Sequence, residues 1–237
     1  MPTGGSGVRA VATRMAAGAC FAAVVGGLTL AGCASGNAAP PPAKPTVASL
    51  LETARSDFRH ASSVRVSGHI RHHGQRLAAD LQMLRSGDAA GQISLDGATM
   101  HIVRVGTDTY VHVTKSFFRY LVSIRHVPSS ACALICGKYL ILPPHAVPRL
   151  SLANLAMMMD KNMSVPKAVS NVGVTTYDGR PAYVVTASGR AAFFAKNGHH
   201  YLIGLRNQKH GMAISFGQWN SVRPISPPPA DKIVKLG

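Results

Sequence analysis

The stretch Ser63-Val-Arg-Val-Ser-Gly-His-Ile70 decides the fold, because apolar and polar side chains alternate along it. After a turn near His73-Gly74, the same alternation continues from Leu77 to Met83. Successive side chains of a strand point to opposite faces, so each segment has one apolar face and one polar, solvent-exposed face. These residues predict a hairpin within an antiparallel sheet.

Further short strands with glycine turns follow this hairpin. We expect strands at 91–95, 99–105 and 109–114, and turns at Gly87, Gly97 and Gly106. A run of short consecutive strands is typical of an antiparallel meander rather than of βαβ units. The next part, with an aromatic cluster at 117–121, is less regular.

The last third returns to strands. Asp178-Gly179 and Asn197-Gly198 predict tight hairpins, because both central residues of a type I′ turn need positive φ. Pro227–Pro229 are expected to end the sheet. The strands expected here are 169–177, 181–186, 191–196, 200–205 and 212–219.

Two helices are expected to accompany the strands. Thr46 is a typical N-cap, and apolar residues recur at helical spacing from Val47 to Ala61. Ser151 is expected to cap a second, methionine-rich helix at 152–163. Methionine suits both a packed core and a surface that accepts variable apolar partners, and both interpretations stay open. The order of elements predicts an α+β fold with one large antiparallel sheet.

The N-terminal segment is typical of a secretory signal. Arg9 and Arg14 precede an apolar run at 15–30, which ends in Leu30-Ala31-Gly32-Cys33. These last four residues resemble the bacterial lipobox, in which the cysteine is acylated and the chain is cut before it. A transmembrane anchor is the alternative, but the run is short for a bilayer, which needs roughly 20 apolar residues.

The lipobox divides the chain into three expected parts. Residues 1–32 would be the signal peptide, and 33–45 a tether rich in Pro and Ala that starts at the acylated Cys33. Residues 46–237 would form a single domain. The protein is thus expected at the cell membrane, anchored by lipid on the extracytoplasmic face.

The chain is strongly basic, with a formal charge of +16. The expected signal contains Arg9 and Arg14 and no acid, so the charge after its removal is +14. An exported domain rarely meets nucleic acid, so we expect none as a partner. Anionic lipid headgroups or acidic envelope polymers fit better. Solubility alone is the other explanation of the charge.

The cysteines support export. With Cys20 in the signal and Cys33 acylated, Cys132 and Cys136 remain as a pair in an oxidising compartment. Their separation of one helical turn is within the reach of a disulfide, and we predict that they are joined.

The sequence lacks the constellations that catalysis needs. It contains nine acids, most of them explained by turns or exposed faces, and no nucleophile elbow, phosphate loop or dinucleotide fingerprint. We predict neither an enzyme nor a cofactor. Adjacent histidines at 72–73 and 199–200 point to opposite faces of a strand, so no metal site is predicted.

Four phrases, in order along a lipoprotein, resemble the LolA-fold envelope lipoproteins, especially the actinobacterial LppX/LprG group. They are Ser63-Val-Arg-Val-Ser-Gly68, Val105-Gly-Thr-Asp-Thr-Tyr-Val111, Gly137-Lys-Tyr-Leu140 and Asp178-Gly-Arg-Pro-Ala-Tyr-Val184. The resemblance implies a strongly curved sheet, or half-open barrel, with helices on its concave face. It also implies an apolar cavity for the acyl chains of lipids or lipoglycans, and a role in carrying them without catalysis. The Cys132/Cys136 pair departs from the best-known members.

Particular residues are expected to serve this function. Arg65 and Arg71 are candidates to meet an anionic headgroup. We expect a monomer with a lipid or lipoglycan ligand and, as a further candidate, an envelope transport protein as partner. The alternative is a regulatory or structural module of the same fold that binds a protein and has no ligand cavity. The predicted cavity lining is Val64, Val66, Ile70, Leu81, Met83, Ile93, Leu95, Leu155, Met158 and Met159.

Overall fold

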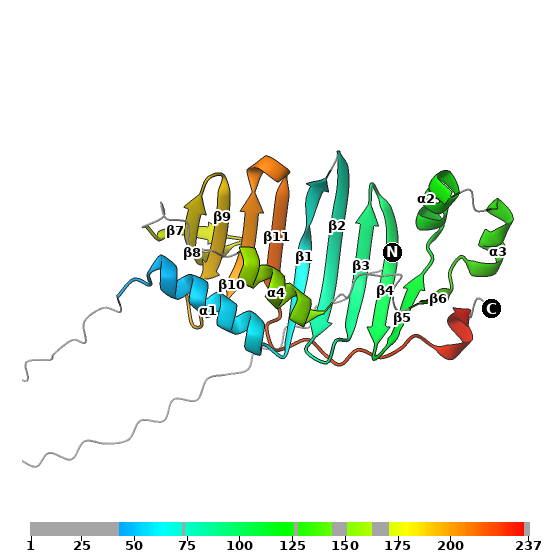
Figure 1. The fold of residues 1–237 in the computed structure, drawn as a ribbon, viewed down its shortest axis with the longest axis horizontal. Helices are drawn as coiled ribbons and strands as arrows, with labels where there is room; N and C mark the ends of the chain where they lie inside the picture. Colours follow the sequence, from blue (N-terminus) through cyan, green and yellow to red (C-terminus); the bar gives the residue numbers. More distant parts are fainter. Residues whose placement is uncertain (1–42, 73, 126–127, 144–150, 163–170, 235–237) are drawn as a thin grey trace, which may run out of the picture. The chain divides into compact units, whose positions relative to one another are not determined.

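The computed structural model describes residues 43–72, 74–125, 128–143, 151–162 and 171–234. Residues Ala43–Gly237 form one compact unit (Figure 1). The predicted signal and Cys33 lie outside the described residues, as does the tether up to residue 42. Among the helices of the described part, none has the length and apolar character needed to cross a bilayer.

The unit is built on one open sheet of twelve strands. Their order across the sheet is β12-β6-β5-β4-β3-β2-β1-β11-β10-β9-β8-β7. The strands are β1 (Ser63–His72), β2 (Gln75–Leu84), β3 (Ala89–Leu95), β4 (Ala98–Val105), β5 (Asp108–His112), β6 (Tyr139–Leu142), β7 (Gly173–Tyr177), β8 (Arg180–Ala187), β9 (Arg190–Ala195), β10 (Leu202–Asn207), β11 (Met212–Gly217) and β12 (Ile233–Val234).

Four α-helices accompany the sheet in the described ranges. They are α1 (Val47–His60), α2 (Lys115–Arg125), α3 (Cys132–Ile135) and α4 (Leu152–Asn162). In Figure 1, α1 and α4 cross the sheet over the strands around β10, β11 and β1, whereas α2 and α3 lie beyond β4. The α+β class and the large curved sheet, a half-open barrel with helices on its concave side, are confirmed.

Helix α1 begins where the sequence predicted. Thr46 Oγ1 accepts a hydrogen bond from Ser49 N, and Ser49 Oγ accepts one from Thr46 N, both at 3.0 Å. This reciprocal capping box satisfies two backbone donors that the first turn leaves unpaired. The buried side of the helix consists of Val47, Leu50, Leu51, Ala54 and Phe58.

The two predicted hairpins differ in outcome. Asp178 and Gly179 both have positive φ, at 47° and 77°, as a type I′ turn requires. At Asn197-Gly198 only the glycine does, and β10 does not start until Leu202, so the tight turn predicted there is wrong. The longer connection lets His199 reach helix α1.

Two features of the sheet margins also differ from expectation. The irregular aromatic stretch forms helix α2, in which Phe118 is buried against Val113 and Leu140. Pro227–Pro229 do not end the sheet, because β12 follows and pairs in parallel with β6. The parallel pair is possible because the chain crosses the sheet before it pairs, so the hairpin constraint does not apply.

The register of β1 defines the two faces of the sheet. Val64 lies opposite Met83 and Val66 opposite Leu81 on β2, so these four share the face that α1 and α4 cover. We call this the inner face. Arg65 and the other residues between them belong to the outer face.

Candidate functional site

An apolar strip on the inner face extends beyond the helices. Ile70 lies opposite Leu77, and Leu77 lies opposite Leu95 on β3. Met100 on β4 lies opposite Ile93 on the same face. Met212, the first residue of β11, continues the row beside Ile70. We define the inner strip as Ile70, Leu77, Leu95, Met100 and Met212.

The inner strip is in contact with solvent. Leu77 is 40% exposed, and the other four members are half-buried, outside the main core cluster. Most apolar side chains of this size contribute to folding by being buried, at roughly 25 cal/mol per Å². The strip therefore retains apolar area that a ligand of the same character would remove from water.

Four of the predicted lining residues are part of the core instead. Val64, Leu81, Met83 and Met159 are each less than a tenth exposed and pack in one cluster with α1 and α4. Their side chains fill the space between the sheet and the two helices. At this end of the inner face, the packed side chains leave no room for a ligand.

The other predicted lining residues are divided between the core margin and the surface. Val66, Ile93 and Leu155 are half-buried and pack against the core cluster. Ile70 and Leu95 belong to the inner strip. Met158 is 58% exposed on α4. The prediction that these ten residues bind lipid together is untested, but the structure brings Ile70 and Leu95 to a surface where contact is possible.

Sequence reasoning missed three residues of the strip, namely Leu77, Met100 and Met212. The signal for Leu77 was present, because it continues the alternation that includes Leu81. Met100 and Met212 also stand at alternating positions of their strands. Only the register between strands shows that they extend the same row.

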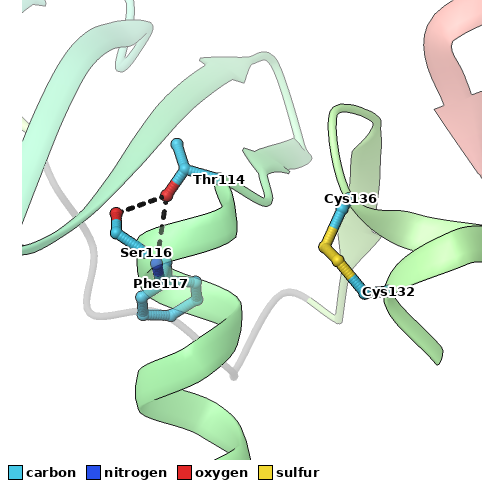
Figure 2. The surroundings of a disulfide bond; sticks show 5 residues. All are labelled: Thr114, Ser116, Phe117, Cys132 and Cys136. Atoms are coloured by element: carbon cyan, nitrogen blue, oxygen red, sulfur yellow. Dashed lines mark hydrogen bonds between the residues drawn. A yellow bond between two sulfur atoms is a disulfide. The ribbon is translucent and has the colours of Figure 1, made fainter. Parts of the chain in front are cut away.

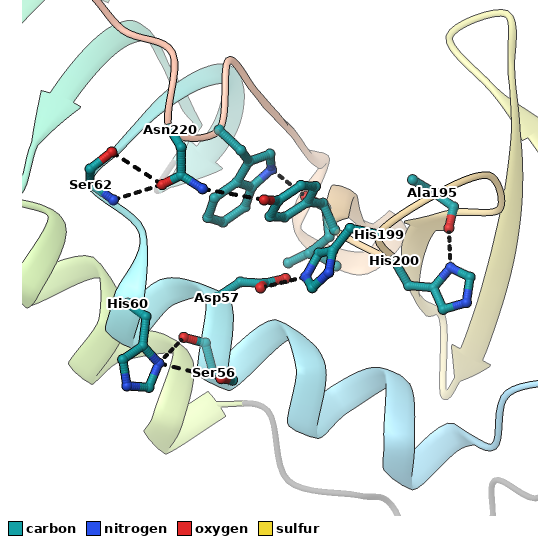
Figure 3. Close-up of polar contacts among 11 residues, drawn as sticks. Ser56, Asp57, His60, Ser62, Ala195, His199, His200 and Asn220 are labelled. Atoms are coloured by element: carbon teal, nitrogen blue, oxygen red, sulfur yellow. Dashed lines mark hydrogen bonds and ion pairs between the residues drawn. The ribbon is translucent and has the colours of Figure 1, made fainter.

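Polar contacts hold α1 over the covered end of the inner face (Figure 3). His199 Nε2 lies 2.7 Å from Asp57 Oδ1 and joins the β9–β10 connection to the helix. Arg59 Nη2 lies 3.1 Å from Asp160 Oδ1 and joins α1 to α4. Arg85 donates to two carbonyl oxygens at the end of α1, from Nε to Ala61 and from Nη2 to Phe58.

The Asp57 carboxylate lies in an unfavourable environment. Its side chain is 11% exposed, and Oδ2 is buried without a hydrogen-bond partner among the described residues. Burial raises the pKa of Asp57, although the hydrogen bond and charge of His199 act in the opposite direction. His199 thus compensates part of the cost of the buried charge.

An aromatic cluster supports the same end of α1. Phe58 meets the edges of Phe216 and Trp219 at centroid distances of 5.4 and 5.0 Å, and Tyr201 stacks on Trp219 at 5.2 Å. The indole Nε1 of Trp219 donates to the carbonyl oxygen of Leu202 at 3.2 Å. Such aromatic pairs stabilise a fold beyond the apolar area that they bury, so they reinforce the packing of α1 on the inner face.

Arg65 and Arg71, the predicted headgroup residues, both alternate onto the outer face. The Arg65 guanidinium donates two hydrogen bonds to the Asp80 carboxylate, at 2.7 and 2.5 Å. The bidentate contact lowers the pKa of Asp80. Arg65 therefore faces away from the inner strip. Arg71 is exposed near the end of β1, where its methylene groups lie beside Gly211.

A disulfide closes the turn that precedes β6 (Figure 2). Cys132 and Cys136 are bonded across helix α3, with their Cα atoms 4.8 Å apart, which confirms the predicted pairing. In the same region, Thr114 Oγ1 accepts a hydrogen bond from Phe117 N at 3.1 Å at the start of α2. Helices α2 and α3 pack against Val113 and Leu140, at the end of the sheet away from α1 and α4.

Two open hollows lie on the outer face. One, of about 360 Å³, is lined by Arg65, Asp80, Gln92 and His101 among others, and the second, of about 400 Å³, by Arg190 and Arg206 among others. Both are open to solvent; the first is mainly polar, whereas the second also has apolar lining from Ala191 and Phe193. Within the described ranges, no three His, Cys, Asp or Glu residues are close enough together to hold a metal ion.

Comparison with known proteins supports the fold class. No protein-family model matches the chain, and no curated protein matches it. Among solved structures, the chain is similar to LprF from Mycobacterium bovis, with a TM-score of 0.52 and 10% identity over 77% of this chain and 96% of that one. An uncharacterized conserved protein from Thermus thermophilus matches at a TM-score of 0.35 and 10% identity, over 79% and 97% of the two chains.

The likeness to LprF concerns the fold alone, since so few residues are identical. It covers nearly all of LprF and supports the LolA-like architecture expected from the four phrases of sequence. What the chain binds must be inferred from its own residues.

Proposed function

We propose that the protein is an envelope lipoprotein of the LppX/LprG-like group that binds the acyl chains of a lipid or lipoglycan on its inner face. It carries or presents this ligand without catalysis. The inner strip supports the proposal, because Ile70, Leu77 and Leu95 form a contiguous apolar row outside the core cluster that α1 and α4 cover. The lipobox at Cys33 supplies the anchor on the extracytoplasmic face of the membrane.

The energetics of such binding need no specific polar contact. Each methylene that leaves water contributes about 0.8 kcal/mol, so a long acyl chain laid along the strip gains several kcal/mol. This agrees with the scarcity of chemical motifs in the sequence. Exposed methionines on α4, Met157 and Met158, adjoin the covered core and can adapt their shape to variable chains.

The decisive experiment is native mass spectrometry combined with lipid extraction. The protein would start at Ala34, which removes the acylation site and retains the whole compact unit Ala43–Gly237 with its core clusters. Expression in an actinobacterial host supplies the lipids. We expect a bound mass that disappears on solvent extraction.

A pair of variants places the ligand. Leu77→Asp introduces a charge into the strip and should abolish the bound mass. Val174→Asp, on the distant strand β7, removes a comparably exposed apolar side chain and should retain it. A clean unliganded mass from wild-type protein contradicts the proposal and favours the alternative, a module that binds a protein partner.

A further inference from the structure

One edge of the sheet collects basic side chains. The β1–β2, β3–β4, β8–β9 and β10–β11 turns and the β5–α2 connection meet there, at the upper edge in Figure 1. The register confirms the grouping: Arg71 lies opposite Arg76, Arg190 lies opposite Asn207, and Gly211 lies beside Arg71. The exposed cations of this basic edge are Arg71, Arg76, Lys115, Arg190 and Lys209. Arg206 is also exposed, but its guanidinium lies over the rings of Tyr177 and Phe193 on the outer face.

Acidic residues are concentrated elsewhere. In the described turns of the basic edge, Asp96 is the one acid, and its Oδ1 accepts a hydrogen bond from Arg76 N. The opposite edge has Asp88 in the β2–β3 turn and Asp108 at the start of β5. Among the four ion pairs found in the described residues, none includes a cation of the basic edge. Among the described residues, no ion pair therefore neutralises the cations of the basic edge.

Apolar side chains reach the same edge. Ile70, Leu77 and Met212 of the inner strip lie within two residues of the strand ends at this edge. Leu134 is 70% exposed in the turn closed by the disulfide, directly before β6 starts from this edge. A leucine this exposed in a covalently closed turn contributes little to the core.

We propose that the basic edge docks on the surface of an anionic bilayer. Lysine and arginine side chains are attracted by the negative potential of anionic lipids, and neighbouring apolar side chains enter the boundary between headgroups and acyl chains. A soluble acidic polymer would account for the cations but not for the exposed Leu77 and Leu134 at the same edge. Docking would turn the open end of the inner strip towards the membrane, and the inference holds whether or not the strip takes a lipid.

The test is flotation of the chain starting at Ala34 with vesicles of equal parts phosphatidylglycerol and phosphatidylcholine. Wild-type protein should bind these vesicles, and should bind less as salt is added. The variant Arg76→Glu/Arg190→Glu/Lys209→Glu should partition at least roughly a hundredfold more weakly. These side chains are exposed and make no ion pair among the described residues, so the fold should persist.

A matched control changes the same charge at the other edge. Arg180, Lys196 and Arg223 are exposed near the opposite ends of the strands, and their replacement by Glu should leave most of the binding intact. Leu134→Asp should weaken binding without altering thermal unfolding. Equal losses in the two triple variants, or equal binding to pure phosphatidylcholine, would overturn the proposal. Binding to a soluble polyanion but not to vesicles would overturn it in favour of an acidic envelope polymer.

Discussion

Leu81 and Leu77 stand on the same strand and the same face of the sheet, yet only one of them is covered. Leu81 is 5% exposed beneath α1 and α4, whereas Leu77, four residues away along β2, is 40% exposed. The chemistry of the two side chains is identical. Their difference shows that the helices, not the strand, decide which part of the inner face is core and which part can meet a ligand.

The covered end is also the end with the most specific contacts. Aromatic packing around Phe58, the Asp57–His199 contact and the Arg59–Asp160 ion pair all lie there. Within the inner strip, Ile70, Leu77 and Leu95 have apolar neighbours across strands. One half of the face is thus specified for stability, while the other remains adaptable.

The largest expected effect comes from removing the central aromatic side chain of the covered end. Phe58→Ala should lower the free energy of unfolding by about 3–5 kcal/mol, because it deletes a fully buried ring and leaves a cavity. Urea denaturation followed by tryptophan fluorescence measures it, since Trp219 contacts the ring. A loss below about 1 kcal/mol would mean that α1 is not part of the stable core.

The contrast between the two ends could be predicted only partly from sequence. Alternation predicted that Val64, Leu81 and Ile70 share a face, and helical periodicity predicted the bounds of α1 almost to the residue. Neither pattern says where along the strands a helix lies. Since covered and uncovered positions have the same period, the ten predicted lining residues include both core and surface.

The alternation along β1 also indicates which face of the sheet the arginines occupy. Arg65 follows Val64 and must therefore face away from any ligand on the inner side. In contrast, the Asp57–His199 contact joins residues 142 positions apart. It also depends on the long β9–β10 connection, where the Asn-Gly motif predicted a tight turn. Long-range polar contacts of this kind leave no local pattern.

A smaller loss of folding stability is expected when the contact between His199 and helix α1 is removed. His199→Ala removes the side-chain hydrogen-bond partner of the buried Asp57 carboxylate, which should cost about 1–3 kcal/mol at neutral pH. The variant should raise the pKa of Asp57 in the folded state still further. A carboxyl whose folded pKa is raised loses stability as the pH rises from its unfolded value, about 4, through its folded value.

The deficit of His199→Ala relative to wild type should therefore shrink below about pH 4, where Asp57 is protonated in both states. Thermal unfolding between about pH 3 and pH 7 measures it. His200→Ala is the matched control, because His200 contacts Ala195 O and Tyr183 rather than α1. A deficit that stays constant over this pH range would show that His199 does not act through Asp57.

The smallest effect on stability is expected at the strip itself. Leu77→Ala should change the free energy of unfolding by less than about 0.5 kcal/mol, since the side chain is already exposed. Leu81→Ala, on the same face, should cost about 2–5 kcal/mol. Parallel urea titrations of the two variants measure the difference directly. If Leu77→Ala is as costly as Leu81→Ala, the strip is part of the core in solution, and an acyl chain has no free surface there to occupy.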